Sequence, residues 1–199
     1  MHDFIKTIFY WFQQAIPFAA FGLAGGVVIL FLLNWKCRRE GKNFPKGQAA
    51  AILLLVCYLG GLAAVTFMNR MDGMRTGFQL YPLLAFWEAW NSFTLQTWLN
   101  PLLNIAMFIP LGVFLPLAAR SLRRWYRMLL MGAGISLGIE LLQYILGRGQ
   151  ADIDDLICNT LGAMLGYCCC LFFVSLARKR WKIAGIYASF PILCVVVFA

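Results

Sequence analysis

The sequence of 199 residues lacks most of the groups on which soluble enzymes rely. Its one histidine, His2, lies at the chain start, which disfavours histidine-based catalysis and histidine-ligated zinc. Neither a Gly-rich phosphate loop nor a GxSxG motif occurs, and the seven cysteines show no CxxC or other metal-type spacing. We therefore expect no metal and no cofactor, and no activated nucleophile is visible.

Charge is scarce as well. Only 13% of the residues are charged and 62% are hydrophobic, whereas a soluble domain averages about 25% charged residues. Each of six apolar runs is roughly long enough to cross a bilayer as a helix; they cover 14–35, 47–67, 102–119, 128–147, 156–177 and 183–199. The sequence therefore predicts an all-α fold, a polytopic transmembrane bundle of about six helices.

The basic residues are confined to alternate connections between these runs. Thirteen of the 17 Lys and Arg lie within 36–46, 120–127 and 178–182. The positive-inside rule makes those connections cytoplasmic and places both chain termini outside. The net charge of +9 is then a sign of topology and of contact with anionic lipid, and we expect no nucleic-acid partner.

The predicted outer loop, 81–101, is unusually aromatic. Phe86, Trp90, Phe93 and Thr97 follow one another at helical spacing, which favours a short helix lying in the outer interface. Such a helix either anchors the loop or forms a rim for an amphiphilic ligand. The predicted rim residues are Trp87, Trp90 and Trp98.

Polar residues interrupt the apolar stretch "GISLGIELLQYILGRGQADIDDLICNTLGAMLGY", residues 134–167. Ser136, Glu140, Gln143 and Gly147 share one helical face, and a second stripe beginning at Asp155 repeats the spacing with Asn159, Gly162 and Gly166. Because the connection between the two helices is short, we expect antiparallel neighbours whose stripes face each other, with Glu140 and Asn159 at similar depth.

These stripes predict one outward-facing polar pocket. Its predicted lining is Asn104, Glu140, Gln143, Arg148, Asp152, Asp155 and Asn159. A carboxylate such as Glu140 inside a membrane is costly and marks a functional site by default. Packing roles remain open for the others: Asp152 and Asp155 fit a capping box, and the amides fit hydrogen bonds between helices. If a reaction occurs, Glu140 and Asp155 are the candidate catalytic acid and base.

The segments "NIAMFIPLG" (104–112) and "IELLQYILGRGQADIDDLICNTLGAMLG" (139–166), preceded by "FQLYPL" (78–83), resemble the VanZ-like family. The resemblance places the family signature on Asn104, Pro110, Gly112, Glu140, Gln143, Asp152, Asp155, Asn159 and Gly162. It implies a small multi-pass protein of the bacterial plasma membrane, in a family whose founder is linked to low-level teicoplanin resistance. The chain then divides into an additional N-terminal helix with its basic loop (1–46), a VanZ-like core (47–177) and a C-terminal basic loop and helix (178–199).

Three functions stay open at this point. The favoured one is a non-catalytic envelope protein that binds an amphiphile, a lipid-linked wall precursor or a lipoglycopeptide at the outer leaflet. The second is an intramembrane enzyme acting on a lipid head group, and the third is a lipid or proton-coupled carrier that uses Glu140. Membrane lipids are partners in each case, and the oligomeric state is left open.

Overall fold

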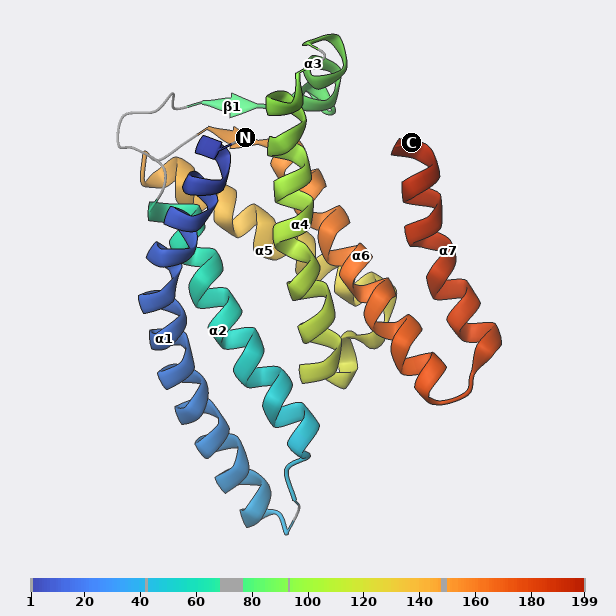
Figure 1. Ribbon diagram of the computed structural model, residues 1–199. Helices are drawn as coiled ribbons and strands as arrows, with labels where there is room; N and C mark the ends of the chain where they lie inside the picture. Colours follow the sequence, from blue (N-terminus) through green and yellow to red (C-terminus); the bar gives the residue numbers. More distant parts are fainter. Residues whose placement is uncertain (1, 42, 69–76, 93, 148–149, 199) are drawn as a thin grey trace.

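The computed structural model describes residues 2–41, 43–68, 77–92, 94–147 and 150–198. The long helices of this part are α1 (His2–Arg39), α2 (Lys46–Met68), α4 (Leu95–Ala118), α5 (Trp125–Ile145), α6 (Ile153–Ala177) and α7 (Trp181–Phe198). Shorter elements are α3 (Leu84–Ser92), the 3-10 turn η1 (Arg120–Arg123) and two short strands, β1 (Phe78–Gln79) and β2 (Ala151–Asp152). The predicted all-α class is confirmed (Figure 1).

Five of the described helices are long and apolar enough to cross a membrane. The candidate spans are Ile16–Arg39, Lys46–Thr66, Leu95–Ala118, Trp125–Ile145 and Ile153–Ala177. The predicted sixth helix also forms, as α7, but its apolar stretch Trp181–Cys194 is shorter than the other five.

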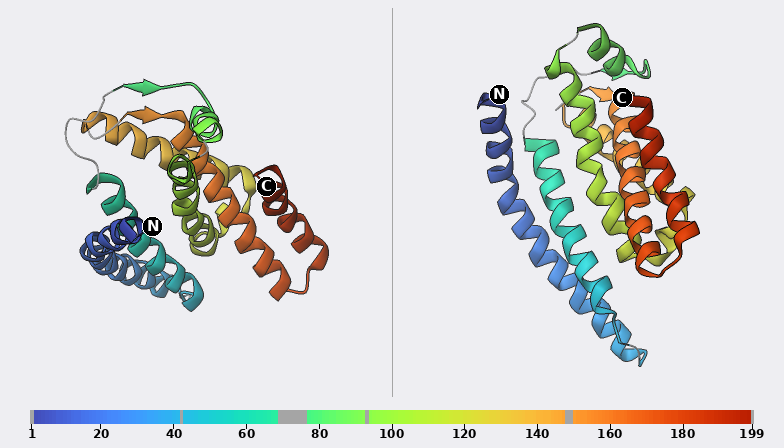
Figure 2. Two further views of the ribbon diagram at one scale, coloured as in Figure 1. Left: turned by 45° about the horizontal axis from the view of Figure 1, so that its top comes forward. Right: turned by 45° about the vertical axis from the view of Figure 1, so that its right-hand side comes forward.

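The helices run alternately up and down, so that the connections gather at two ends of the bundle (Figures 1 and 2). The α1–α2, α4–α5 and α6–α7 connections, which carry the basic residues, lie at one end, called here the basic end. Helix α3 and both strands lie at the opposite end, called here the α3 end. The alternation predicted from the basic residues is therefore a property of the fold.

Helices α4 and α6 form the centre of the bundle and approach each other at glycines. A Cβ atom on Gly112 would lie 2.0 Å from the Ala163 carbonyl oxygen, and one on Gly162 would lie 2.1 Å from that of Ile105. Gly166 is equally close to the Ile109 carbonyl. Small residues are what allow helix backbones to approach closely within a membrane. Around this contact lies a core that includes Phe108, Leu111 and Tyr167.

The loop predicted at 81–101 is mostly helical. It holds α3 and the first turns of α4, which begins at Leu95 and not near Pro101, where the apolar run starts. Thr94, with φ −105° and ψ 138°, breaks the path between the two helices. Thr97 therefore belongs to α4, and Phe93 lies outside the described residues. Pro101 therefore lies inside α4 and not before its first turn.

Candidate functional site

The α3 end is tied together by a short parallel pairing of β1 with β2. Phe78 pairs with Ala151 and Gln79 with Asp152, and the Phe78 ring lies 4.6 Å from that of Tyr144, centroid to centroid. The segment "FQLYPL" is thereby fixed against the chain that enters α6. A two-residue parallel pair depends on tertiary contacts, which explains why the sequence pattern did not predict it.

The acidic residues that start α6 hold three different parts of the molecule. Asp152 is the N-cap of α6, and its side chain accepts a hydrogen bond from the Asp154 N–H at 2.8 Å. The Asp154 carboxylate accepts hydrogen bonds from the backbone N–H groups of Leu83 and Ala85, the latter at 2.7 Å. Asp155 accepts a hydrogen bond from the Asn104 side chain on α4. The predicted N-cap at Asp152 is confirmed, and Asp154 anchors α3. The bonds differ from the predicted capping box with Asp155, because the Asp152 side chain accepts from Asp154 and the Asp152 N–H donates to Glu140.

Helix α5 supplies three buried polar side chains to the same region. Glu140 accepts a hydrogen bond from the Asp152 N–H at 3.1 Å. Gln143 donates to the carbonyl oxygen of Thr66 on α2 at 3.2 Å. Ser136 accepts a hydrogen bond from Asn159 on α6 at 3.0 Å. The partner of Asn159 therefore lies one turn deeper along α5 than Glu140, the residue we expected at its depth.

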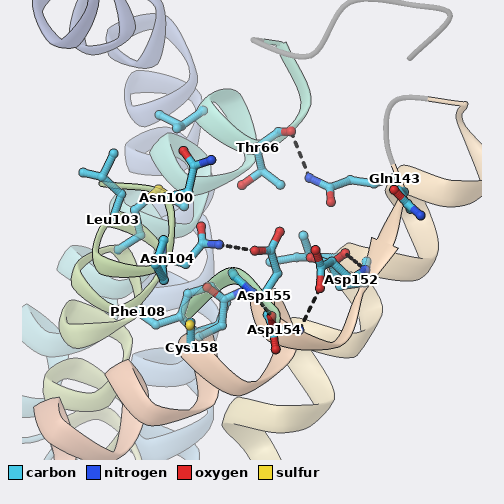
Figure 3. Close-up of a pocket in the computed structure, with 18 of the residues that line it drawn as sticks. Thr66, Asn100, Leu103, Asn104, Phe108, Gln143, Asp152, Asp154, Asp155 and Cys158 are labelled. Atoms are coloured by element: carbon cyan, nitrogen blue, oxygen red, sulfur yellow. Dashed lines mark hydrogen bonds between the residues drawn. The ribbon is translucent and has the colours of Figure 1, made fainter. Parts of the chain in front are cut away.

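A cavity of about 830 Å³ lies among these groups, bordered by α2, α3, α4, α5 and α6 (Figure 3). Its size falls within the range of small-molecule binding pockets, about 300–1,000 Å³. Helix α3 contributes Ala85 and Glu88, and the apolar part of the wall includes Val65, Leu103 and Phe108. The cavity therefore combines a polar lining with apolar walls at the end of the bundle opposite the basic end.

Three oxygen atoms of the lining are buried without a hydrogen-bond partner. They are Oγ1 of Thr66, Oε1 of Gln143 and Oδ1 of Asn159. These side chains are 8%, 2% and 4% exposed, respectively. A buried polar atom without a partner costs free energy, so each such atom in a native fold calls for an explanation.

The structure brings most of the predicted pocket residues into this one cavity. Asn104, Glu140, Gln143, Asp152, Asp155 and Asn159 all line it. Arg148 lies outside the described residues, so its predicted place in the pocket stays a prediction. The roles of Glu140 and Asp155 as catalytic candidates, and the pocket's affinity for any ligand, likewise stay predictions.

The predicted aromatic rim lies beside the cavity but does not line it. Trp87 and Trp90 on α3 are 66% and 68% exposed. Trp98 lies in the first turns of α4 and packs edge-on against Phe86, with the ring centroids 6.2 Å apart. The three tryptophans thus border the α3 end in an arrangement that suits aromatic rings at a membrane interface.

Several lining residues were not predicted from the sequence, and two of them take part in hydrogen bonds across the site. Thr66 is a single hydroxyl at the end of an apolar run, and its position opposite Gln143 depends on how α2 packs. For Asp154 the sequence pattern indicates only a favourable charge at the start of α6. Its bonds to the backbone of Leu83 and Ala85 depend on a partner about 70 residues away in the chain.

The fold and the site define a class: a membrane protein of several spans with a cavity that is lined by polar groups at one end of its helices. A family model described as VanZ/LLP1 matches residues 49–174. The chain therefore belongs to the VanZ/LLP1 family, as its motifs indicated. Searches of curated proteins and of solved structures found no match to the chain.

Proposed function

We propose that this protein is a multi-pass protein of the bacterial plasma membrane that binds the head group of an amphiphile at the outer leaflet. By doing so it would lower susceptibility to lipoglycopeptides such as teicoplanin, either by binding the drug or by binding the lipid-linked wall precursor. Support for the outer leaflet comes from the positive-inside rule, because the cavity is lined by residues of α3 and β2, which lie at the end away from the basic residues.

The observation that carries this proposal is the 830 Å³ cavity below a helix with exposed tryptophans. An amphiphile needs a polar chamber for its head group and an apolar surface for its chain. The cavity wall supplies the first, and Trp87 and Trp90, exposed on α3, supply part of the second. No covalent step is required for such a role.

An intramembrane enzyme with Glu140 as acid or base receives less support. Glu140 accepts the Asp152 N–H and Asp155 accepts the Asn104 amide, so both carboxylates hold the fold together. Cys158, the thiol in the lining, is only 1% exposed. A binding role is compatible with these hydrogen bonds, because it does not require either carboxylate to act as an acid or a base.

The test compares variants in a teicoplanin-susceptible host that expresses the chain. Glu140→Gln keeps the shape of the side chain and an oxygen that can accept the Asp152 N–H but removes the charge, and Asn159→Leu removes the amide. Both should be produced at normal levels and lose the protection against teicoplanin. Ser175→Ala is the matched control, because Ser175 is a buried polar residue of α6 that does not line the cavity.

Full protection by both cavity variants would refute the proposal and leave these groups as packing residues. Release of a modified head group by the wild-type protein, abolished by Glu140→Gln, would favour the enzyme instead. Proton-dependent lipid movement in vesicles would favour the carrier.

A further inference from the structure

The unpartnered oxygens of the cavity indicate which head-group chemistry it takes. We infer that the cavity binds an amphiphile through hydrogen-bond donors of its head group, hydroxyl or ammonium, and discriminates against phosphate; this inference rests on the proposed function and, within it, favours the lipoglycopeptide over a phosphate-linked wall precursor.

The assignment at Gln143 is fixed by chemistry. Its amide contacts the backbone carbonyl oxygen of Thr66, which can only accept, so the NH₂ group must point there and Oε1 must point away. That oxygen has no partner. The hydroxyl of Thr66, on the residue whose carbonyl Gln143 contacts, is also without one. These two oxygens next to the α2–α5 contact therefore require a hydrogen-bond donor from a bound molecule.

In the structure the Asn159 Nδ2 donates to the Ser136 hydroxyl, and Oδ1 is a buried acceptor without a partner. A hydroxyl can also donate, so chemistry fixes the orientation of Gln143 and not that of Asn159. Gln143 on α5 and Asn159 on α6 both line the one cavity, and each holds a buried amide oxygen without a partner. An ammonium group offers only hydrogen-bond donors, and each hydroxyl of a head group offers one donor. Either group can therefore pair with these oxygens.

Charge in the lining points the same way. The described lining contains the carboxylates of Glu88, Glu140, Asp152, Asp154 and Asp155 and, within that described part, no Lys, Arg or His. Several of these carboxylates already accept backbone or side-chain N–H groups, and none becomes a donor in its ionised form. Phosphate brings acceptor oxygens and negative charge, so the described carboxylates of the lining repel it.

The test uses three amphiphiles that share a dodecyl chain: dodecylammonium, dodecyl maltoside and dodecyl phosphate. Binding to the full chain in lipid nanodiscs is measured for each below its micellar concentration. Dodecylammonium and dodecyl maltoside should bind with saturation, and dodecyl phosphate should bind more weakly than either. Equal or tighter binding of dodecyl phosphate would overturn the inference, as would binding by none of the three.

The variant Thr66→Val tests whether the Thr66 hydroxyl takes part in binding the amphiphile. The variant removes the unpartnered hydroxyl while keeping the carbonyl that Gln143 contacts, so the protein without amphiphile should unfold at a higher temperature. The same variant should weaken dodecyl maltoside or dodecylammonium binding by about 2- to 10-fold, the effect of one hydrogen bond. Thr160→Val is the control, since the Thr160 hydroxyl donates to the Leu156 carbonyl and does not line this cavity.

Unchanged affinity in Thr66→Val together with higher stability would mean that the hydroxyl contacts water only, and the inference would fail. The susceptibility assay with Glu140→Gln is independent of these measurements. Selective binding of the two donor amphiphiles alongside unchanged teicoplanin protection would therefore refute the proposed function and keep the head-group preference.

Discussion

Replacing Gly162 with alanine tests whether the α4–α6 contact holds the cavity together. The added Cβ would lie 2.1 Å from the Ile105 carbonyl oxygen, about 1.3 Å short of the 3.4 Å at which ordinary van der Waals contact begins. The Cβ position is fixed by the backbone of α6 and the carbonyl oxygen belongs to the backbone of α4, so relief requires the two helices to separate. Overpacking of this kind costs about 1–3 kcal/mol.

The matched control is Gly138→Ala. Gly138 also belongs to a GxxxG pair, on α5, but a Cβ there meets nothing within 4 Å. Alanine is a better helix former than glycine by about 1 kcal/mol, so Gly138→Ala should be neutral or stabilising. After the same gain is allowed for at Gly162, the two variants should still differ by about 1–3 kcal/mol in free energy of unfolding.

Thermal unfolding in one detergent, followed with a thiol-reactive dye, suits this comparison because Cys158, Cys168 and Cys170 on α6 are buried. For a chain of this size the difference corresponds to about 2–12 °C in Tm, with Gly162→Ala the lower. Equal Tm values for the two variants would show that α4 and α6 tolerate separation. The close glycine contact would then not be what fixes the distance between Asn104 and Asp155.

Three further predictions address the α3 end and the topology. Asp154→Asn removes a charged acceptor and should lower amide hydrogen-exchange protection at the start of α3 by more than about tenfold. Unchanged protection would contradict the anchoring role of Asp154. In a cysteine-free background, Tyr81→Cys should react with an impermeant thiol reagent on intact cells and Ser121→Cys should not; the reverse pattern would invert the predicted orientation. In single-tryptophan variants, Trp87 and Trp90 should be quenched by lipid-borne quenchers, whereas red-shifted emission untouched by them would mean a solvated helix.

The sequence predicted which residues gather at the cavity because the relevant periodicity is local. Spacing along one helix fixes which side chains share a face, and the short connection between α5 and α6 makes their faces neighbours. Glu140, Gln143 and Asn159 were placed in this way, and all three line the cavity. The depth of each residue relative to its partner is not local, and here the expectation was one turn off.

The sequence holds two GxxxG pairs, Gly134–Gly138 on α5 and Gly162–Gly166 on α6, and they show a second limit of sequence reasoning. Gly162 and Gly166 closely approach a neighbouring backbone, whereas nothing lies within 4 Å of a Cβ on Gly134 or Gly138. The motif allows a close approach between helix backbones but does not determine which helix is the partner. That partner is α4, which supplies Gly112 at the same contact and so completes a mutual fit.

The arrangement at the start of α6 also explains why an apolar segment keeps so many acidic groups. Asp152 caps its own helix, Asp154 holds the backbone before and within α3, and Asp155 holds α4 through Asn104. Glu140 adds α5 by accepting the Asp152 N–H. Each carboxylate thereby has a supporting role, and the cost of burying it is offset by N–H donors.

It follows that the costly carboxylates are not the atoms that the fold leaves unexplained. The oxygens without partners are neutral ones, on Thr66, Gln143 and Asn159. They belong to residues that line a cavity whose shape the carboxylates maintain through α3, α4, α5 and α6. Removing the acceptor oxygens of a carboxylate should therefore disturb the cavity as a whole, whereas substituting a neutral oxygen should change what the cavity binds. Thr66→Val distinguishes a disturbed cavity from altered binding, because the variant is expected to raise the stability of the protein while it lowers the affinity for the amphiphile.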